Sequence, residues 1–564
     1  MYVLGVNSYF HDASVCLIRD GEIVAALEEE RWYRDDKHTT VFPLRSLRYA
    51  LEAAADSGLK IDHLGVNMSP VRCFGDAAGP GGALAGYTRR HHKNFKHLRK
   101  ATQQTNREVR RALRRFGYKA DYTFHEVAHH EAHAASTFFV SPFEEAAILT
   151  VDGNGEWATT SMFVGKGNQV ERLGRVGLPH TLGGVYGSIT EYLGFKRNND
   201  EFKVMGLSSY GDPERFKEQI AKLIWPTEDG FFQVDPAYFN IGPFDFRPGE
   251  RLVELFGEPT RVRESELLQF HKDVAAALQA RTEEVGVHMA RHLQRQTGLK
   301  KICMAGGVAL NCVMNTRILT DTDFDDIYIQ PASYDAGGSL GACYWIYNQI
   351  LGQPRGPVMD RANFGPSFED PEIESILKEG LLRYRKADDI ALEAAKLIAE
   401  GKIVGWFQGR AEFGPRALGH RSILADPTRT DMQDHVNLRV KHREDFRPFA
   451  PSSPVEDYQT YFDAPAEDWF MTKVIPVREE FHERLPAITH VDGTARLQTV
   501  RADTNPLYHK LIKELGKLRE VPIVLNTSFN VRGEPMVLTP KDAIRCFFTT
   551  GIDHLAIGSF IVDK

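Results

Sequence analysis

The first part of the chain alternates apolar runs with short polar turns, a pattern that predicts strands. YVLGVN (residues 2–7) is typical of a buried strand, and VCLIRDGEIVAALEEE (15–30) of two strands joined by Asp20-Gly21, a tight-hairpin dipeptide. Near residue 145, AAILTVDGNGEWATTSMFV repeats the order of strand, glycine-containing polar turn and second strand. The repeat indicates a diverged internal duplication, although two such hairpins can also arise by chance in an α/β protein.

Helical spacing of apolar residues comes later in the chain. It extends through residues 265–298, and Gly298 provides a helix end signal. KICMAGGVALN (301–311) then predicts a buried strand, a glycine turn and the start of a helix. Residues 351–368 are rich in Pro and Gly and lack periodicity. We therefore expect one domain of residues 1–355 and a second of residues 356–564.

Length and composition restrict the protein class. A chain of 564 residues exceeds the roughly 250–300 residues that one hydrophobic core supports, and 42% hydrophobic with 26% charged residues is typical of globular proteins. The net charge of −7 argues against a nucleic-acid-coating protein. No apolar run reaches about 18 residues, and no leader pattern precedes MYVLGVN. Six cysteines without a CxxC pair disfavour zinc ribbons and disulfide scaffolds. We expect a soluble, cytoplasmic, two-domain α/β protein.

One segment departs from this acidic balance. Residues 89–115 hold 11 Lys or Arg and a single acid, Glu108, with helical character towards the end. A solvated basic helix is the simpler interpretation. The alternative is an insert on the substrate side that attracts anions or a partner.

His129 and His133 form the first candidate site. The Ala-rich sequence AHHEAHAAS predicts a helix, and the i,i+4 spacing places both imidazoles on one face. The spacing does not match HExxH, so a zincin is excluded. Asp152 and Asp335, each in a turn, are candidates to complete a site that would suit a divalent first-row metal such as iron or manganese. A polar helix face with hydrogen-bonded histidines remains an open alternative.

Glycine turns form a second candidate site, at Asp152-Gly153-Asn154-Gly155, Gly306-Gly307 and Gly337-Gly338. Such turns let a backbone approach phosphate closely. None matches a P-loop or a Rossmann fingerprint. Together with the duplicated hairpin, they resemble the split nucleotide cleft of actin-like ATPases.

A dense cationic block forms the third candidate site. Residues 408–452 hold Arg410, Arg416, Arg421, Arg439, Lys441, Arg443 and Arg447 among Gly-Pro turns. Rigid turns that aim guanidinium groups suit phosphate or carboxylate binding. Further along, Asn526 and Ser528 lie two apart on a predicted strand and so face one side. The block predicts a pocket for a small anion, with a structural salt-bridge network as the alternative.

Ordered motifs along the whole chain resemble the O-carbamoyltransferases of antibiotic and nodulation-factor biosynthesis, the family of the tobramycin, cephalosporin and nodulation U carbamoyltransferases. The resemblance rests on VLGVNSYFHDAS, EEERWYRDDKH, HHEAHAAS, VDGNGE, KVMGL, GGVALN, ASYDAGGSLGA, GPRALGHRS, NLRVKHREDFRPFAPS, ARLQTV and LNTSFNVRGEP. It implies an N-terminal duplicated actin-like (ASKHA, Kae1-like) domain and a C-terminal YrdC-like α/β domain.

The resemblance also implies a reaction. The C-terminal domain would make carbamoyl-adenylate from carbamoyl phosphate and ATP, with Mg²⁺ accompanying ATP, and release phosphate and pyrophosphate. The N-terminal domain would transfer the carbamoyl group to a hydroxyl of a small molecule at an Fe²⁺ site. A closed chamber would protect the labile intermediate from water.

The resemblance carries over to individual residues of this sequence. The implied metal ligands are His129, His133, Asp152 and Asp335. The carbamoyl-phosphate and adenylate pocket corresponds to Arg416, Lys441, Arg447, Arg496, Asn526 and Ser528. The N-terminal nucleotide site corresponds to Asp152, Gly153, Asn154, Lys203, Gly206, Gly306, Gly307 and Asn311. His11 is the candidate to assist the acceptor hydroxyl, as general base or by holding phosphate, and Lys37 is the candidate to stabilise the same charge.

The acceptor itself is not predicted. The basic segment 89–115 has no match in the tobramycin enzyme, and Tyr9 stands where that enzyme has an acidic residue. Both differences disfavour a cationic aminoglycoside as acceptor and leave a neutral or anionic one. The alternatives are a tRNA threonylcarbamoyl enzyme, a hydrogenase-maturation carbamoyltransferase, which normally has zinc-binding CxxC pairs, and a non-enzymatic nucleotide-binding regulator. We expect neither membrane nor nucleic-acid partners, and the sequence leaves a homodimer open.

Overall fold

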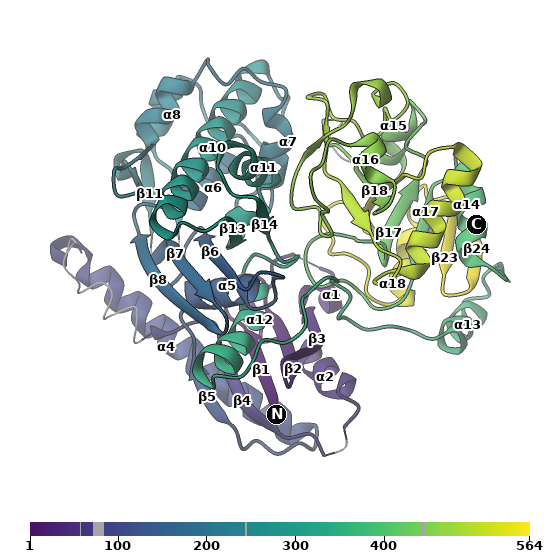
Figure 1. The fold of residues 1–564 in the computed structure, drawn as a ribbon, viewed down its shortest axis with the longest axis horizontal. Helices are drawn as coiled ribbons and strands as arrows, with labels where there is room; N and C mark the ends of the chain where they lie inside the picture. Colours follow the sequence, from purple (N-terminus) through teal and green to yellow (C-terminus); the bar gives the residue numbers. More distant parts are fainter. Residues whose placement is uncertain (36, 57, 71–83, 243–244, 442–445) are drawn as a thin grey trace. The chain divides into compact units, whose positions relative to one another are not determined.

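Two sheets with one common topology make up the N-terminal part of the protein (Figure 1). The structure, a computed structural model, describes residues 1–564 except 36, 57, 71–83, 243–244 and 442–445, and gives only the backbone for 84–95. The first sheet has the order β3-β2-β1-β4-β5 and the second the order β8-β7-β6-β13-β14. The first contains β1 Tyr2–Asn7, β2 Ser14–Arg19, β3 Glu22–Glu28, β4 Ile61–Val66 and β5 Thr123–Glu126. The second contains β6 Glu145–Val151, β7 Ala158–Lys166, β8 Gln169–Gly177, β13 Lys301–Ala305 and β14 Asp326–Tyr328.

The strand senses also repeat. In each sheet three antiparallel strands are followed by two that run parallel to the first. The Asp20-Gly21 hairpin forms as expected, with φ of +51° and +85° at these two residues. The internal duplication predicted from the hairpin pattern is therefore confirmed.

Two helices pack between the two sheets and against each other. Helix α12 (Gly337–Tyr344) packs on β1, β2 and β4, helix α5 (His129–Phe138) packs on β6, β7 and β13, and the two helices pack on each other. Small residues permit this close crossing, because a Cβ added to Gly341 would lie 1.8 Å from the carbonyl oxygen of Ala132. The α5–α12 contact thus fixes the helix that carries both candidate histidines.

Replacing Gly341 by alanine is expected to destabilise the protein by about 3 kcal/mol or more. Alanine gains about 1 kcal/mol over glycine in a helix, but the clash with the Ala132 backbone outweighs that gain. The measurement is the thermal-unfolding midpoint. Gly58→Ala is the control, because its Cβ would meet nothing closer than 3.4 Å, and an equal shift in both variants would contradict the prediction.

The remaining helices of this part lie outside the sheets. The long helix α10 begins at Gln269, four residues later than the sequence pattern suggests, and ends at Thr297, where Gly298 takes a φ of +67°. The basic segment forms most of helix α4 (Leu84–Arg115), which in Figure 1 extends away from the β1–β5 sheet. Helix α7 (Glu201–Ser208) packs on α10, and α11 (Cys312–Asp321) follows β13.

A third sheet organises the C-terminal part. Its order is β15-β24-β23-β16-β17-β22-β18-β21. Apolar residues of its strands alternate between two cores, one under helices α14 (Ile390–Ala399) and α17 (Pro506–Arg519), the other on the side of α13 (Asp370–Glu379) and α18 (Pro540–Phe548). The strands are β15 Tyr384–Lys386, β16 Val404–Phe407, β17 Arg421–Ala425, β18 Ala450–Pro454, β21 Gln498–Val500, β22 Val524–Ser528, β23 His554–Ile557 and β24 Phe560–Asp563.

The chain divides into two compact units, and each unit contains two separate segments of the sequence. The first unit contains Met1–Glu29 and His38–Met359, and the second contains Glu30–Lys37 and Asp360–Lys564. The short segment Glu30–Lys37 is bound within the second unit by two buried arginines. Arg31 donates to the carbonyl of Gly414, and Arg34 donates to Glu534 at 2.7 Å and to the carbonyl of Met536 at 2.9 Å. Among the described helices, none has the length and apolar character needed to cross a membrane.

Candidate functional site

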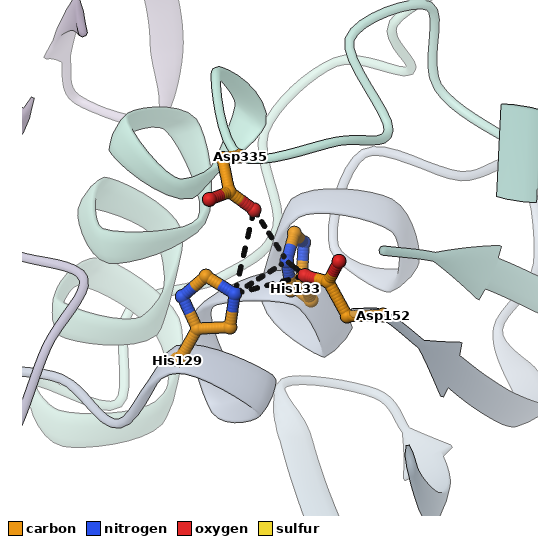
Figure 2. Close-up of side chains that lie close together, drawn as sticks. All are labelled: His129, His133, Asp152 and Asp335. Carbon is orange, nitrogen blue, oxygen red and sulfur yellow. Dashed lines mark hydrogen bonds and ion pairs between the residues drawn. The ribbon is translucent and has the colours of Figure 1, made fainter. Parts of the chain in front are cut away.

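Helix α5 positions a pair of buried histidines. His129 and His133 stand one helical turn apart with their Nε2 atoms 3.0 Å from each other, and both rings are almost completely buried (Figure 2). The helix and its two-histidine face, predicted from AHHEAHAAS, are both present.

Two carboxylates from separate turns face this pair. Asp152, directly after β6, places Oδ2 3.0 Å from His129 Nε2 and 2.9 Å from His133 Nε2. Asp335, in the turn before α12, places Oδ1 3.5 Å and 3.6 Å from the same nitrogens. All four ligand atoms lie within 4.8 Å of one another. The structure therefore brings together the four residues expected from the sequence as metal ligands, and we refer to this group of candidate ligands as the metal centre.

The imidazoles and carboxylates of the metal centre shift one another's pKa values. Burial opposes protonation of His129, but Asp335 and Asp152 outweigh it and raise the pKa of that imidazole well above its ordinary value. Burial likewise opposes ionisation of Asp152, yet hydrogen bonds from His129 and His133 keep its pKa well below the usual range. A buried cluster that is this polar requires charge compensation from within or from a bound ion.

The donor set fits a divalent cation. Two imidazole nitrogens and two carboxylate oxygens converge on one point, and this ligand combination suits first-row divalent metals. Residues behind the ligands fix their orientation, as is usual around metal sites. Asp152 Oδ1 accepts the backbone N–H groups of Gly153 at 2.7 Å and Gly307 at 3.3 Å, which leaves Oδ2 facing the histidines.

Other polar side chains hold the surrounding backbone. Asn7, at the end of β1, donates through Nδ2 to the carbonyls of His11, Asp12 and Asp335 at 2.7, 2.9 and 3.1 Å. Glu156 accepts the backbone N–H of His129 at 3.0 Å and that of Ser69 at 2.7 Å. Sequence reasoning missed both residues, although Asn7 closes the predicted first strand and Glu156 belongs to VDGNGE.

His130, on the same helix, differs from His129 and His133 because both of its ring nitrogens contact groups of the fold. Its Nδ1 lies 2.7 Å from Thr150 Oγ1 and its Nε2 lies 3.1 Å from the carbonyl oxygen of Ala158. Burial, reinforced by the charges of His129 and His133, lowers its pKa to about 3, so it stays neutral. Both of its nitrogens contact groups other than the two carboxylates.

The glycine turns expected to contact a nucleotide meet beside the metal centre. Gly306, between β13 and the next turn, has a φ of +93°, and a Cβ there would lie 2.2 Å from the Val151 carbonyl oxygen. Gly307 contacts Asp152, as described above. Asn154 is half-buried, and its side-chain oxygen has no hydrogen-bond partner among the described residues. Phosphate oxygens or a ribose could approach such a surface closely.

Three further residues of the expected nucleotide site lie on or next to helices α7 and α11. Asn311 caps α11 by accepting the N–H of Met314 at 3.0 Å and exchanges two hydrogen bonds with Gln279, so its amide is occupied. Lys203 forms an ion pair with Asp200 at 3.2 Å on α7. Gly206 is half-buried on the same helix.

The two residues expected to assist transfer fall in different units. His11 is exposed on the loop after β1, and its Nε2 lies 3.3 Å from Asn198 Nδ2. Lys37 is half-buried in the segment that clusters with the second unit.

In the second unit, Lys441 is buried beside the end of β22. Its ammonium donates to the carbonyl of Ser528 and, at 2.9–3.0 Å, to the carbonyl and Oδ1 of Asn530. Ser528 Oγ in turn donates to Asn530 Oδ1 at 2.7 Å. We call Lys441, Ser528 and Asn530 the Lys441 cluster. Asn530 was missed, although it ends the motif LNTSFN.

A second polar cluster lies earlier on the same strand. Asn526 Nδ2 donates to the carbonyl of Ala417 at 3.0 Å and contacts Ser452 Oγ at 3.2 Å and Gln498 Oε1 at 3.3 Å. Its Oδ1 is buried without a partner among the described residues. Arg416, Arg447 and Arg496 are half-buried, and Arg416 directly precedes the Asn526 contact at Ala417.

Other cations of the block are structural. Arg421 is buried against Phe407, with its guanidinium carbon 3.7 Å from the ring centre, and donates to the main-chain carbonyls of Gln408 and Gly409. Arg410 donates to the carbonyls of Phe364 and Gly365. Arg439 forms a surface ion pair with Asp553 at 3.2 Å, and Arg443 lies outside the described residues. Part of the block therefore stabilises the fold, as the alternative interpretation held.

Comparison with protein families matches nearly the whole chain. The family model described as carbamoyltransferase N-terminus matches residues 2–344, and the one described as carbamoyltransferase C-terminus matches residues 395–564. The metal centre lies in the first match, and the Lys441 and Asn526 clusters lie in the second.

Individual relatives agree with the family models. The chain is 39% identical to nodulation protein NolNO of Sinorhizobium fredii, over 99% of this chain and 80% of that protein. It is 34% identical to the 3'-hydroxymethylcephem-O-carbamoyltransferase of Streptomyces clavuligerus, over 65% of each. Among solved structures, full-length HypF in its phosphate- and nucleotide-bound form is 14% identical, with a TM-score of 0.31 over 62% of this chain and 55% of that chain.

Proposed function

The chain belongs to the carbamoyltransferase family, and from that premise we propose that it carbamoylates a hydroxyl of a small molecule in two ATP-dependent steps. In the first step, carbamoyl phosphate, ATP and water yield carbamoyl-adenylate, phosphate and pyrophosphate. In the second, the acceptor hydroxyl attacks the carbamoyl carbon, its proton leaves to a base, and AMP departs. The observation that carries this proposal is the metal centre of two histidines and two aspartates within a chain of this family.

The first step belongs to the second unit in this proposal. Carbamoyl phosphate carries a compact negative charge, and a buried ammonium with neighbouring hydroxyl and amide groups offers it charge and hydrogen bonds in a low-dielectric setting. Lys441 supplies the buried positive charge, and on binding it would exchange one of its hydrogen bonds to Ser528 or Asn530 for one to phosphate. Asn526 supplies an amide on β22, the strand of Ser528. Arg416, Arg447 and Arg496 would bind the remaining phosphate oxygens.

The second step belongs to the first unit. His129, His133, Asp152 and Asp335 would hold a divalent metal, for which we propose iron. Such a metal supplies Lewis-acid polarisation of a carbonyl or phosphoryl oxygen when bound. His11, exposed on the loop after β1, would accept the proton of the acceptor hydroxyl, and the glycine turns beside Asp152 would hold the adenylate phosphate.

The finer fold assignment is also part of the proposal. The repeated sheets with two helices between them support an actin-like, Kae1-like first domain. The eight-stranded mixed sheet of the second unit would be the YrdC-like domain that forms the adenylate, with ATP bound as its Mg²⁺ complex.

Purified protein given ATP and carbamoyl phosphate without acceptor is expected to release pyrophosphate and phosphate in equal amounts. The reason is that adenylate formation precedes and does not need the acceptor. Pyrophosphate and phosphate are measured separately, with either substrate omitted as the control. Pyrophosphate that requires bicarbonate and threonine in place of carbamoyl phosphate would contradict the proposal.

A further inference from the structure

Helix α4 packs directly on the loop that carries His11. Ser8 Oγ and Thr105 Oγ1 are 2.6 Å apart and buried, and the Phe10 ring meets the His97 ring edge to face at 6.1 Å. Leu98 completes this contact with Phe10 in a small apolar cluster. The inner face of α4 is therefore part of the surroundings of the loop after β1.

One flank of α4 carries five exposed cations, with Gln103 in the interval between Lys100 and Arg107. At 100° per residue, they fall within a sector of about 60° and extend over about 27 Å of helix. We call this flank the basic stripe, and it consists of Lys96, Lys100, Arg107, Arg111 and Arg114, all exposed.

The basic stripe has fewer acidic partners than several other surface helices. Cations of those helices pair with an acid four residues away, as in Arg48–Glu52, Arg317–Asp321 and Lys378–Glu374. Helix α10 shares the feature in part, because Lys272, Arg291 and Arg295 have no acid at that spacing. On the stripe only Arg111 has an acidic partner, Glu108 at 2.9 Å, and the other four have none among the described residues.

Like charges one turn apart weaken a helix by roughly 0.2–0.5 kcal/mol per pair. Lys96 with Lys100, and Arg107 with Arg111, are such pairs. A helix surface that alternates acidic and basic residues is solvated equally well and avoids this repulsion. A row of cations with only one acidic partner therefore indicates a negatively charged partner.

Tyr9 connects the basic stripe to the reactive loop. Its side chain lies near Gln104, which stands between the stripe and the inner face of α4, and it is within the electrostatic reach of both Glu108 and Arg107. Tyr9 is two residues from His11. An anion held by Lys100 and Arg107 would therefore lie beside the loop from which His11 projects.

We propose that the basic stripe binds the phosphates of the acceptor, so that the acceptor is a soluble molecule carrying a diphosphate or two phosphates. This inference rests on the proposed function, because it specifies the substrate of the same transfer site. Arginine forks match phosphate oxygens, and the outer cations of the stripe add to the field that attracts the ligand.

The overall charge favours a phosphorylated small molecule over nucleic acid. The net charge of −7 disfavours a long polyanion that must follow the rest of the surface.

Binding of inorganic tripolyphosphate to the full chain tests the inference. Calorimetry is run with a saturating non-hydrolysable ATP analogue and carbamoyl phosphate, so that the nucleotide and carbamoyl-phosphate sites are filled. Lys100→Glu with Arg107→Glu is expected to weaken binding at least tenfold, and Lys100→Gln with Arg107→Gln to weaken it less. The matched control is Lys217→Glu with Lys222→Glu, an exposed pair on α8 (Lys217–Leu223) of the same unit, with an expected change below twofold.

Equal affinities in the stripe variants and the α8 control, or no binding by the wild type, would overturn the inference. So would wild-type protein that sediments with phosphatidylglycerol vesicles through the stripe, because the phosphate would then be a membrane headgroup. Pyrophosphate release by the wild type is measured on the same preparation. Its absence counts against the proposed two-step function, whereas loss of the variant effect counts against the stripe alone.

Discussion

His133→Asn is expected to lower the affinity for iron at least about 100-fold and to abolish carbamoyl transfer. Asparagine removes the Nε2 atom, which in the structure lies 2.9 Å from Asp152 and 3.0 Å from His129. Changing groups that merely support a ligand usually costs 10–100-fold in metal affinity, so removal of a ligand should cost at least as much. The measurement is metal content after dialysis against a weak chelator, followed by transfer activity.

His130→Asn is the matched control for that experiment. It makes the same chemical change three residues away on the same helix, at a ring whose nitrogens contact Thr150 and Ala158. We expect a lower thermal midpoint but full metal content. Iron retained by His133→Asn at the wild-type level would remove His133 from the ligand set, and equal metal loss in both variants would indicate general destabilisation of α5.

Lys441→Met is expected to reduce carbamoyl-phosphate-dependent pyrophosphate release by about 10²–10³-fold, the usual cost of removing one preorganised donor from a developing charge. Methionine keeps the length of the side chain but removes the buried ammonium that contacts Ser528 and Asn530. The rate is measured at saturating ATP over a range of carbamoyl phosphate concentrations.

Arg439→Met provides the control, because Arg439 lies in the same helical turn but points to a surface ion pair with Asp553. We expect its rate to stay within about twofold of the wild type, since an exposed ion pair contributes little. A Lys441→Met enzyme that releases pyrophosphate normally while remaining folded would move the carbamoyl phosphate site away from the Lys441 cluster.

Much of the first unit could be predicted because its signals are local. The hairpin at Asp20-Gly21 depends on two residues that tolerate positive φ, and its repetition near residue 145 is enough to infer two matching sheets. The pairing of His129 with His133 follows from helical geometry alone. Asp152 and Asp335 are separated from them in sequence, and glycine turns at strand ends were the only local sign that they would meet.

Other features depend on long-range contacts that no local pattern encodes. Arg421 and Lys441 are equally basic in sequence, yet Arg421 donates to main-chain carbonyls behind Phe407, while Lys441 lies by Ser528. Asn311 begins a helix and also exchanges hydrogen bonds with Gln279, a partner 32 residues away. Burial decides which polar residues serve the fold, and burial is a property of the assembled chain.

The segment Glu30–Lys37 has a consequence for how this protein can be divided. A fragment that starts at Asp360 would lack Arg31 and Arg34, and so leave Gly414 and Glu534 without their donors. A fragment that ends at Met359 would carry those two arginines with nothing to bind. The backbone passes from one unit to the other three times, at residues 29–30, 37–38 and 359–360. Separate expression of two halves, or a gene fission in evolution, would therefore have to graft this octapeptide onto the later half.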